Sequence, residues 1–133
     1  MVDYERKYVK YKVKLKRLNE GNLTHKMNVQ QPWFDLMKQG KKTVEGRLNR
    51  GKFKSLQIGN IIEWTNKQHT FKLKIVGIRK YKTFKEMLEK EGLGKVLPTK
   101  NNIKDGIAVY RQFYSEKDEI ENGVLAIEFN KIY

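Results

Sequence analysis

The segment Gly40–Arg47 constrains this chain most, because it places four charges and two glycines in one turn-prone stretch. The amphipathic pattern of residues 32–39 predicts a short helix before it. The turn and apolar run of residues 58–64 predict a strand after it. The charged side chains of the segment are Lys41, Lys42, Glu45 and Arg47. Charges held between fixed elements suit a polar ligand, such as a phosphate or the edge of a nucleobase. The alternative is that Gly40 only caps the helix and the charges are solvated on a loop.

The rest of the chain predicts a mixture of strands and helices. The expected strands cover residues 25–29, 61–65, 70–81 and 124–129, and the expected helices cover 32–39, 83–91 and the later part of 103–114. The polar turn at residues 66–69 predicts that the second and third strands pair as a hairpin. Thr83 and Glu86 form a capping-box pattern at the start of the second helix, and Gly92 follows its end. This order supports an α+β fold, a small barrel decorated by helices.

Composition favours a basic protein that meets nucleic acid. The chain has 133 residues and a formal net charge of +14, and such a field attracts nucleic acid or an anionic membrane surface. It has no cysteine, which excludes disulfides, cysteine-based zinc sites and cysteine nucleophiles. No apolar run approaches the roughly 20 residues of a membrane span, and no signal-peptide pattern opens the chain. His25 and His69 lack metal-ligand spacing. We therefore expect an intracellular protein, cytoplasmic or nuclear, monomeric, with no membrane partner, metal or cofactor.

Residues 1–21 are expected to form a basic extension to a domain that covers residues 22–133. They carry seven Lys and Arg residues against three acidic ones. Apolar side chains follow a helical spacing at Tyr4, Tyr8, Tyr11, Leu15 and Leu18, although residues 11–15 also alternate as a strand would. We favour a helix that packs its apolar stripe on the barrel. Its basic face offers auxiliary phosphate contacts from Lys10, Lys12, Lys14, Lys16 and Arg17.

The charged segment also fits a family pattern. Gly40, Lys42, Glu45 and Arg47 fill the fixed places of G-x-K-x-x-E-x-R, which resembles the signature of ASCH domains (activating-signal-cointegrator homology), a branch of the PUA-like fold. Further landmarks follow in the expected order: the Gly59–Ile62 turn and strand, Tyr81–Leu88, Leu97–Pro98, Tyr110–Tyr114 and Gly123–Ile127. The resemblance covers about residues 23–133. It implies a PUA-like barrel with a cleft that binds RNA or a modified nucleoside.

Each member of the signature has a possible role in such a cleft. Lys42 offers a compact charge to a phosphate or a base carbonyl, and Arg47 offers a planar fork. Glu45 accepts hydrogen bonds from N–H groups, which phosphate lacks, so it indicates reading of a base unless it only pairs with Lys42 or Arg47. We expect these groups to be exposed in the cleft, and the carboxylate to raise the pKa of the lysine.

Aromatic side chains supply the stacking that unpaired bases require. Trp33 stands beside the signature at a helix start and is the candidate that faces the ligand. Tyr110 and Tyr114 are one helical turn apart, and one of them is expected to line the cleft. Phe34 and Trp64 lie in apolar patterns and are expected in the core.

The resemblance leaves an enzymatic alternative. Some small bacterial ASCH proteins are amidohydrolases that remove the acetyl group of N4-acetylcytidine. Lys42 matches their lysine, but their threonine aligns with Glu45, and Glu89 or Glu91 would have to supply their distal acid. A third possibility is a protein-interaction module. RNA or single-stranded nucleic acid is the partner that we expect first.

Overall fold

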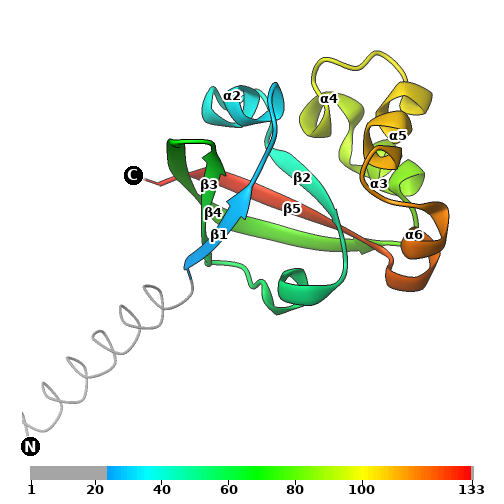
Figure 1. Ribbon diagram of the computed structural model, residues 1–133, viewed down its shortest axis with the longest axis horizontal. Helices are drawn as coiled ribbons and strands as arrows, with labels where there is room; N and C mark the ends of the chain where they lie inside the picture. The colour runs from blue at the N-terminus through cyan, green and yellow to red at the C-terminus, as the bar shows by residue number, and fades with distance from the viewer. Residues whose placement is uncertain (1–23, 133) are drawn as a thin grey trace, which may run out of the picture.

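The structure is a computed structural model that describes residues 24–132 (Figure 1). The predicted basic extension and its phosphate contacts, Lys10, Lys12, Lys14, Lys16 and Arg17, lie outside the described residues. Within the described part of the chain, no helix is both long and apolar enough to cross a membrane.

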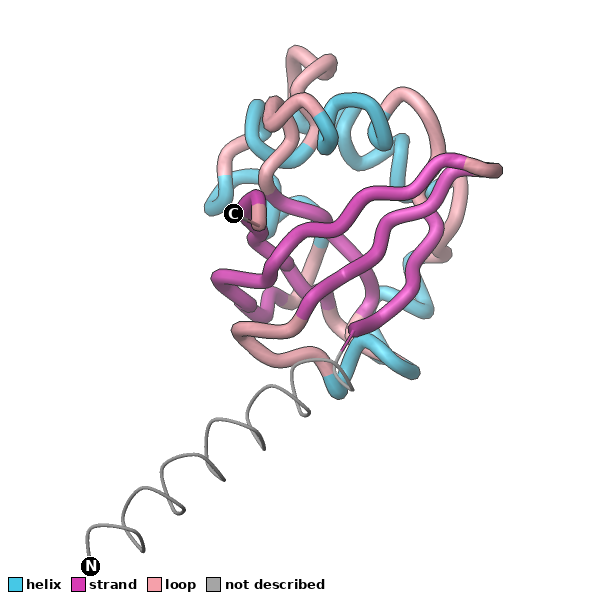
Figure 2. The backbone as a smooth tube through the Cα atoms, turned by 90° about the vertical axis from the view of Figure 1, so that its left-hand side faces the viewer, coloured by secondary structure: helices cyan, strands magenta, loops and turns pink. Residues whose placement is uncertain are grey.

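A curled five-stranded sheet forms the centre of the molecule (Figures 1 and 2). Its strands are β1 (Thr24–Asn28), β2 (Val44–Leu48), β3 (Ile61–Asn66), β4 (His69–Tyr81) and β5 (Val124–Lys131). The order across the sheet is β1-β3-β4-β5-β2; β1 and β3 are parallel and the other pairs are antiparallel. β1 and β2 are thus the two edges of the sheet. The predicted hairpin is confirmed as β3 and β4, which pair from Asn66 and His69 outward.

Short helices pack at the ends of the sheet (Figure 1). They are α2 (Trp33–Lys38), the 3-10 helix η1 (Gly51–Ser55), α3 (Phe84–Glu91), α4 (Leu93–Val96), α5 (Ile103–Arg111) and α6 (Glu116–Asn122). The predicted cap of α3 is confirmed, since the Thr83 side chain accepts a hydrogen bond from the Glu86 backbone N–H at 3.0 Å. Helix α5 covers Ile103–Arg111, the earlier part of the 103–114 stretch and not the later part that was predicted, and the chain then turns through Phe113 and Tyr114. The expected α+β fold is confirmed.

Two apolar clusters fill the interior and hold β2 between them. The first packs inside the curled sheet and includes Phe34 and Trp64, which confirms that both are core residues. The second lies between the sheet and helices α3 and α5 and includes Val44 and Leu48. Side chains alternate along a strand, so Glu45 of β2 is directed away from the second cluster. This alternation brings charged groups of an edge strand to the interior.

Candidate functional site

Backbone hydrogen bonds fix the chain between α2 and β2. Gly40 has a φ of +77°, a left-handed conformation that favours glycine and turns the chain at the end of the helix. The backbone N–H groups of Lys41 and Lys42 then both donate to the Leu36 carbonyl, at 2.9 and 3.0 Å. Thr43 donates to the Lys95 carbonyl at 3.0 Å and accepts from Phe129 at 3.1 Å. The signature therefore begins on a rigid support.

The Lys42 side chain is fully buried, with 0% of its surface exposed. Its Nζ donates to the carbonyls of Val44, at 2.8 Å, and Val96, and lies 3.3 Å from Glu45 Oε1. Three acceptors match the three N–H groups of an ammonium. The expectation that Lys42 is exposed in the cleft is therefore wrong, because its ammonium group is buried and makes all of its contacts with protein groups.

Glu45 and Arg47 form the second half of the same cluster. Arg47 donates to Glu45 Oε2 from Nε at 3.3 Å and from Nη2 at 3.1 Å, and the Gly46 backbone N–H donates to Glu45 Oε1 at 3.1 Å. Nη2 of Arg47 also donates to the Asn28 carbonyl at 2.8 Å. Arg47 thus connects β2 to β1 across the two edges of the sheet. Of the two roles considered for Glu45, the structure shows the pairing with Lys42 and Arg47.

The ionisation of the cluster follows from burial and mutual attraction. Burial lowers the pKa of Lys42, and the opposing pull of Glu45 does not restore its ordinary value, which corrects the expected upward shift. Burial alone would raise the pKa of Glu45, but the charges of Lys42 and Arg47 and their hydrogen bonds bring it below its usual value. With all three groups charged, the cluster carries one net positive charge.

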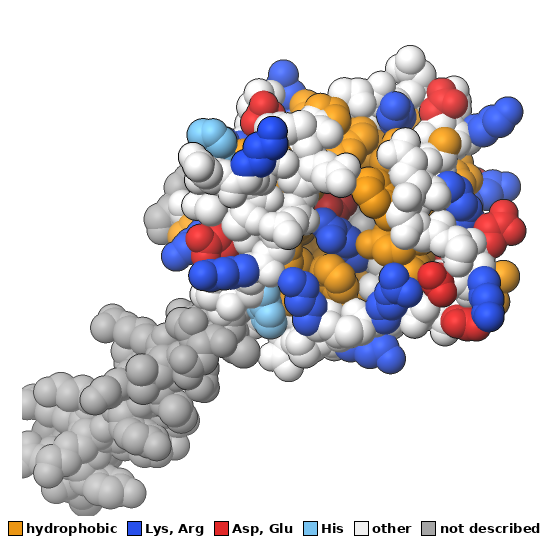
Figure 3. Space-filling model, viewed as in Figure 1, with side chains coloured by type: hydrophobic (Ala, Val, Ile, Leu, Met, Phe, Trp, Pro, Cys, Tyr) orange, Lys and Arg blue, Asp and Glu red, His pale blue; other side chains and the backbone are white. Residues whose placement is uncertain are grey.

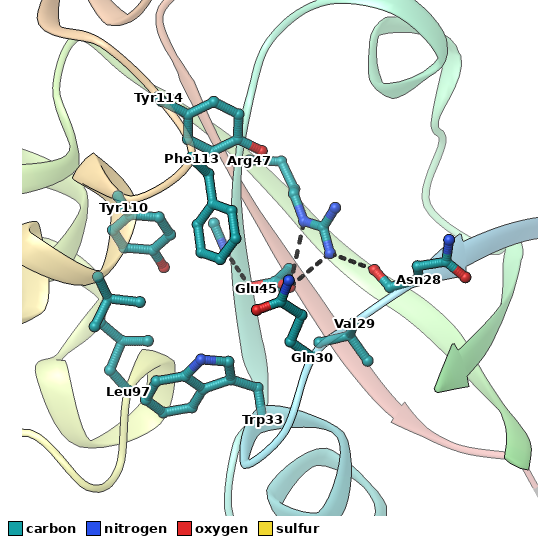
Figure 4. Close-up of a pocket in the computed structure, with 12 residues that line it drawn as sticks. Asn28, Val29, Gln30, Trp33, Glu45, Arg47, Leu97, Tyr110, Phe113 and Tyr114 are labelled. Atoms are coloured by element: carbon teal, nitrogen blue, oxygen red, sulfur yellow. Dashed lines mark hydrogen bonds and ion pairs between the residues drawn. The ribbon is translucent and has the colours of Figure 1, made fainter. Parts of the chain in front are cut away.

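A pocket of about 220 Å³ opens at the seam between β1 and β2 (Figure 4). It is lined by Asn28, Val29, Gln30, Trp33, Glu45, Gly46, Arg47, Leu97, Val109, Tyr110, Phe113 and Tyr114. In Figure 4 the two tyrosines and Phe113 lie at the upper left of the pocket, Leu97 and Trp33 at its lower left, and Arg47 between Tyr114 and Asn28. Apolar side chains gather around a hollow in the middle of this face, with Lys and Arg residues about them (Figure 3). The pocket thus combines aromatic walls with a fixed, net positive cluster.

The structure brings most of the predicted site residues together. Those that line the pocket are Trp33, Glu45, Arg47, Tyr110 and Tyr114. Both tyrosines line it, whereas one was expected. Lys41 is exposed and does not line it, and Lys42 Nζ lies 5.7 Å from the centre of the Trp33 ring without lining it either.

Residues that sequence reasoning did not place in the site complete it. Phe113 is 50% exposed and belongs to the aromatic run that ends at Tyr114, so the signal was present in the sequence. Asn28 ends β1, and Val29 and Gln30 follow it without any motif; they reach the pocket only because the sheet curls.

Tyr110 and Gly46 meet in close contact at the pocket wall. The Tyr110 ring stacks on Phe84 with centroids 4.1 Å apart, and burial raises the pKa of its hydroxyl well above the ordinary value. A Cβ on Gly46 would lie 2.7 Å from the Tyr110 hydroxyl oxygen and 2.5 Å from the Met87 methyl carbon. Glycine is therefore required at this place by close approach.

The acidic candidates for hydrolysis lie elsewhere. Glu91 is bound to Arg79 and to the Tyr81 hydroxyl, and Glu89 is exposed on α3; neither lines the pocket. Among residues 24–132, no group of three or more His, Cys, Asp or Glu side chains is arranged to hold a metal ion. Lys42 has no free N–H and no open side toward the pocket, which argues against its use as an amine nucleophile or base.

Low pH should reduce the stability of the folded protein, because it protonates carboxylates that are paired with cations. The folded-state pKa values of Glu45 and Glu91 lie below their ordinary value of 4.5, so their stabilising contribution is complete above pH 4.5 and is lost as pH falls through the lower folded values. The melting temperature should therefore drop steadily between about pH 5 and pH 2. Glu91→Gln should reduce this dependence, whereas Glu89→Gln in the same helix should leave it unchanged. If melting temperature falls equally with pH in the unmodified protein and in both variants, Glu91 does not contribute to the pH dependence.

Comparison with known proteins places the chain among a recognised group. The family model for the ASCH domain matches residues 27–133. The crystal structure of hypothetical protein PH0355 is 45% identical, with a TM-score of 0.77, over 82% of this chain and 99% of that one. The solution NMR structure of protein PF0455 from Pyrococcus furiosus is 41% identical, with a TM-score of 0.68, over 80% of this chain and 96% of that one. No curated protein matches the chain.

Proposed function

Because this chain belongs to the ASCH domain family, with its PUA-like α+β fold, we propose that the pocket between β1 and β2 binds single-stranded RNA by taking up one unpaired base. The observation that carries the proposal is the pairing of aromatic walls with the Arg47 guanidinium in one cavity. Single-stranded nucleic acids are held by this combination of stacking surfaces and positive charge.

The size of the pocket favours one base over a larger ligand. Its volume of about 220 Å³ is below the roughly 300–1,000 Å³ of pockets for drug-sized molecules. It opens on a face where Lys and Arg side chains surround the hollow (Figure 3). In this arrangement the surrounding charge attracts the phosphate backbone, and the cavity receives the base.

Phe113 is the side chain whose removal tests the proposal most cleanly. Its ring is half exposed at the pocket, so Phe113→Ala should change folding little but should weaken binding of single-stranded RNA by about 1–3 kcal/mol, the value of one stacked base. The measurement is a fluorescence titration with a labelled single-stranded oligonucleotide at fixed salt, repeated on the duplex.

Ile120→Ala is the matched control. Ile120 is 78% exposed on α6 and does not line the pocket, so this substitution removes an exposed apolar side chain without touching the site. If Phe113→Ala and Ile120→Ala both bind RNA with the affinity of the unmodified protein, and added salt weakens binding in all three, RNA is held by the basic surface and not by the pocket. A protein-interaction module would then be the better description.

A further inference from the structure

Glu45 is unable to read a base in this pocket, because its carboxylate is already occupied. Oε1 contacts the Gly46 N–H and the Lys42 ammonium, and Oε2 receives two N–H groups of Arg47. These four contacts use the acceptor capacity of a carboxylate. A ligand amino group would have to displace a partner that the fold holds in place.

Two polar groups of the pocket that remain available can only donate. The Trp33 indole N–H has no hydrogen-bond partner within residues 24–132, and it faces the interior of the pocket (Figure 4). Arg47 uses Nε and Nη2 and keeps its Nη1 group without a hydrogen bond in the described part of the chain. Indole and guanidinium nitrogens donate only. Gln30 presents an amide that can serve either way, but it is exposed in the loop after β1 and is free to turn.

A buried hydroxyl adds an independent sign of a missing partner. Tyr110 is 4% exposed and lines the pocket, and its oxygen has no hydrogen bond among residues 24–132. A buried polar group without a partner is costly, and such groups are rare in folded proteins. A polar group of a ligand that reaches this wall would satisfy it, as donor or as acceptor, since a tyrosine hydroxyl serves either way.

We propose that the pocket selects bases by their carbonyl oxygens, so that it takes a 4-oxo pyrimidine such as uracil over cytosine and a 6-oxo purine over adenine. This inference rests on the proposed function, because it names the class of base that the same pocket accepts. The physical reason is that an amino group would face the Trp33 and Arg47 donors and leave them unpaired, whereas a carbonyl accepts from them. The net positive charge of the cluster also favours an electron-rich oxygen.

The test uses single-stranded oligonucleotides in which every position is abasic except one central base. Uracil and cytosine form the decisive pair, since they have the same ring size and differ at position 4, carbonyl against amino, and at N3, which donates in uracil and accepts in cytosine. The uracil strand should bind about ten-fold more tightly than the cytosine strand. Hypoxanthine and adenine repeat the comparison with a two-ring base. Equal affinities for uracil and cytosine, or a preference for cytosine, would overturn the proposal.

Trp33→Phe then tests whether the indole N–H of Trp33 recognises the carbonyl group. The substitution keeps an aromatic ring but removes the N–H, so the ratio of uracil to cytosine affinity should fall to about three-fold or less. Phe71→Leu is the control, because Phe71 is a partly buried ring packed on the first cluster and does not line the pocket. Its ratio should stay at that of the unmodified protein. An unchanged ratio in Trp33→Phe would remove the indole from the proposed role, and the preference would then have to come from another donor.

Failure of this inference is distinguishable from failure of the proposed function. If the four single-base strands bind equally well, more tightly than a fully abasic strand, and Phe113→Ala weakens them all, the pocket binds bases without reading carbonyls. If the fully abasic strand binds as well as the others, the pocket takes up no base and both proposals fall.

Discussion

Replacing Lys42 by methionine should lower the free energy of unfolding by about 3–5 kcal/mol, the cost of removing one partner from a buried ion pair. The substitution leaves the carbonyls of Val44 and Val96 without their buried donor and leaves the Glu45 carboxylate with Arg47 as its counter-charge and the Gly46 N–H as its other donor. Methionine has a similar length, so the loss reflects charge and hydrogen bonds more than volume.

Urea unfolding at neutral pH measures the effect, and the adjacent lysine provides the control. Lys41 carries the same side chain but is exposed and makes no ion pair within residues 24–132. Lys41→Met should therefore change the free energy of unfolding by less than about 0.5 kcal/mol. Similar stabilities for the two variants would show that the Lys42 contacts contribute nothing, and the buried cluster would need another explanation.

The sequence predicted best those elements whose signals are local. The β3–β4 hairpin has alternating strands and a polar turn, and α3 has its cap, its apolar face and its final glycine between Thr83 and Gly92. Helix α6 was missed because it carries one large apolar side chain and many acidic ones. Distant contacts stabilise it: Glu119 accepts from the Phe84 backbone N–H at 2.7 Å and from Arg111 at 2.6 Å.

Strand β2 shows why the candidate site was predicted only in part. Its charged residues and Gly46 favour a turn when the local sequence is considered by itself. The segment is a strand because it pairs with β5 and because two apolar clusters pack against it. The signature identified Glu45 and Arg47 as site residues, because their types and spacing are local. It gave no sign that Lys42 turns inward, since one of its acceptors, the Val96 carbonyl, lies 54 residues away in the chain. Burial of a charge is a property of the packed structure, and periodicity does not encode it.

Glu45→Gln should be about as damaging as the loss of Lys42, at about 3–5 kcal/mol near neutral pH. The amide keeps the size of the side chain and one acceptor, but it leaves Lys42 and Arg47 as neighbouring cations with no counter-charge between them. The folded state should then favour release of the Lys42 proton, so stability should recover partly as pH rises from 7 to 9. The unmodified protein should gain less over this range, because Glu45 opposes loss of that proton. A pH-independent loss in Glu45→Gln would contradict the electrostatic account.

The double variant decides whether these two losses come from one interaction. In Lys42→Met the partner left behind is the Glu45 carboxylate, which keeps Arg47 as its counter-charge, and in Glu45→Gln it is the Lys42 ammonium, which keeps none. Each single substitution therefore removes attraction from a buried charge. The double variant removes both and leaves Arg47, which is partly exposed and still bound to the Asn28 carbonyl at 2.8 Å. Its loss in free energy of unfolding should therefore be smaller than the sum of the two single losses by about 1–3 kcal/mol. If the two losses are additive, Lys42 and Glu45 stabilise the fold independently, each through the backbone groups that it contacts. The ion pair between them would then contribute no interaction energy to the stability of the protein.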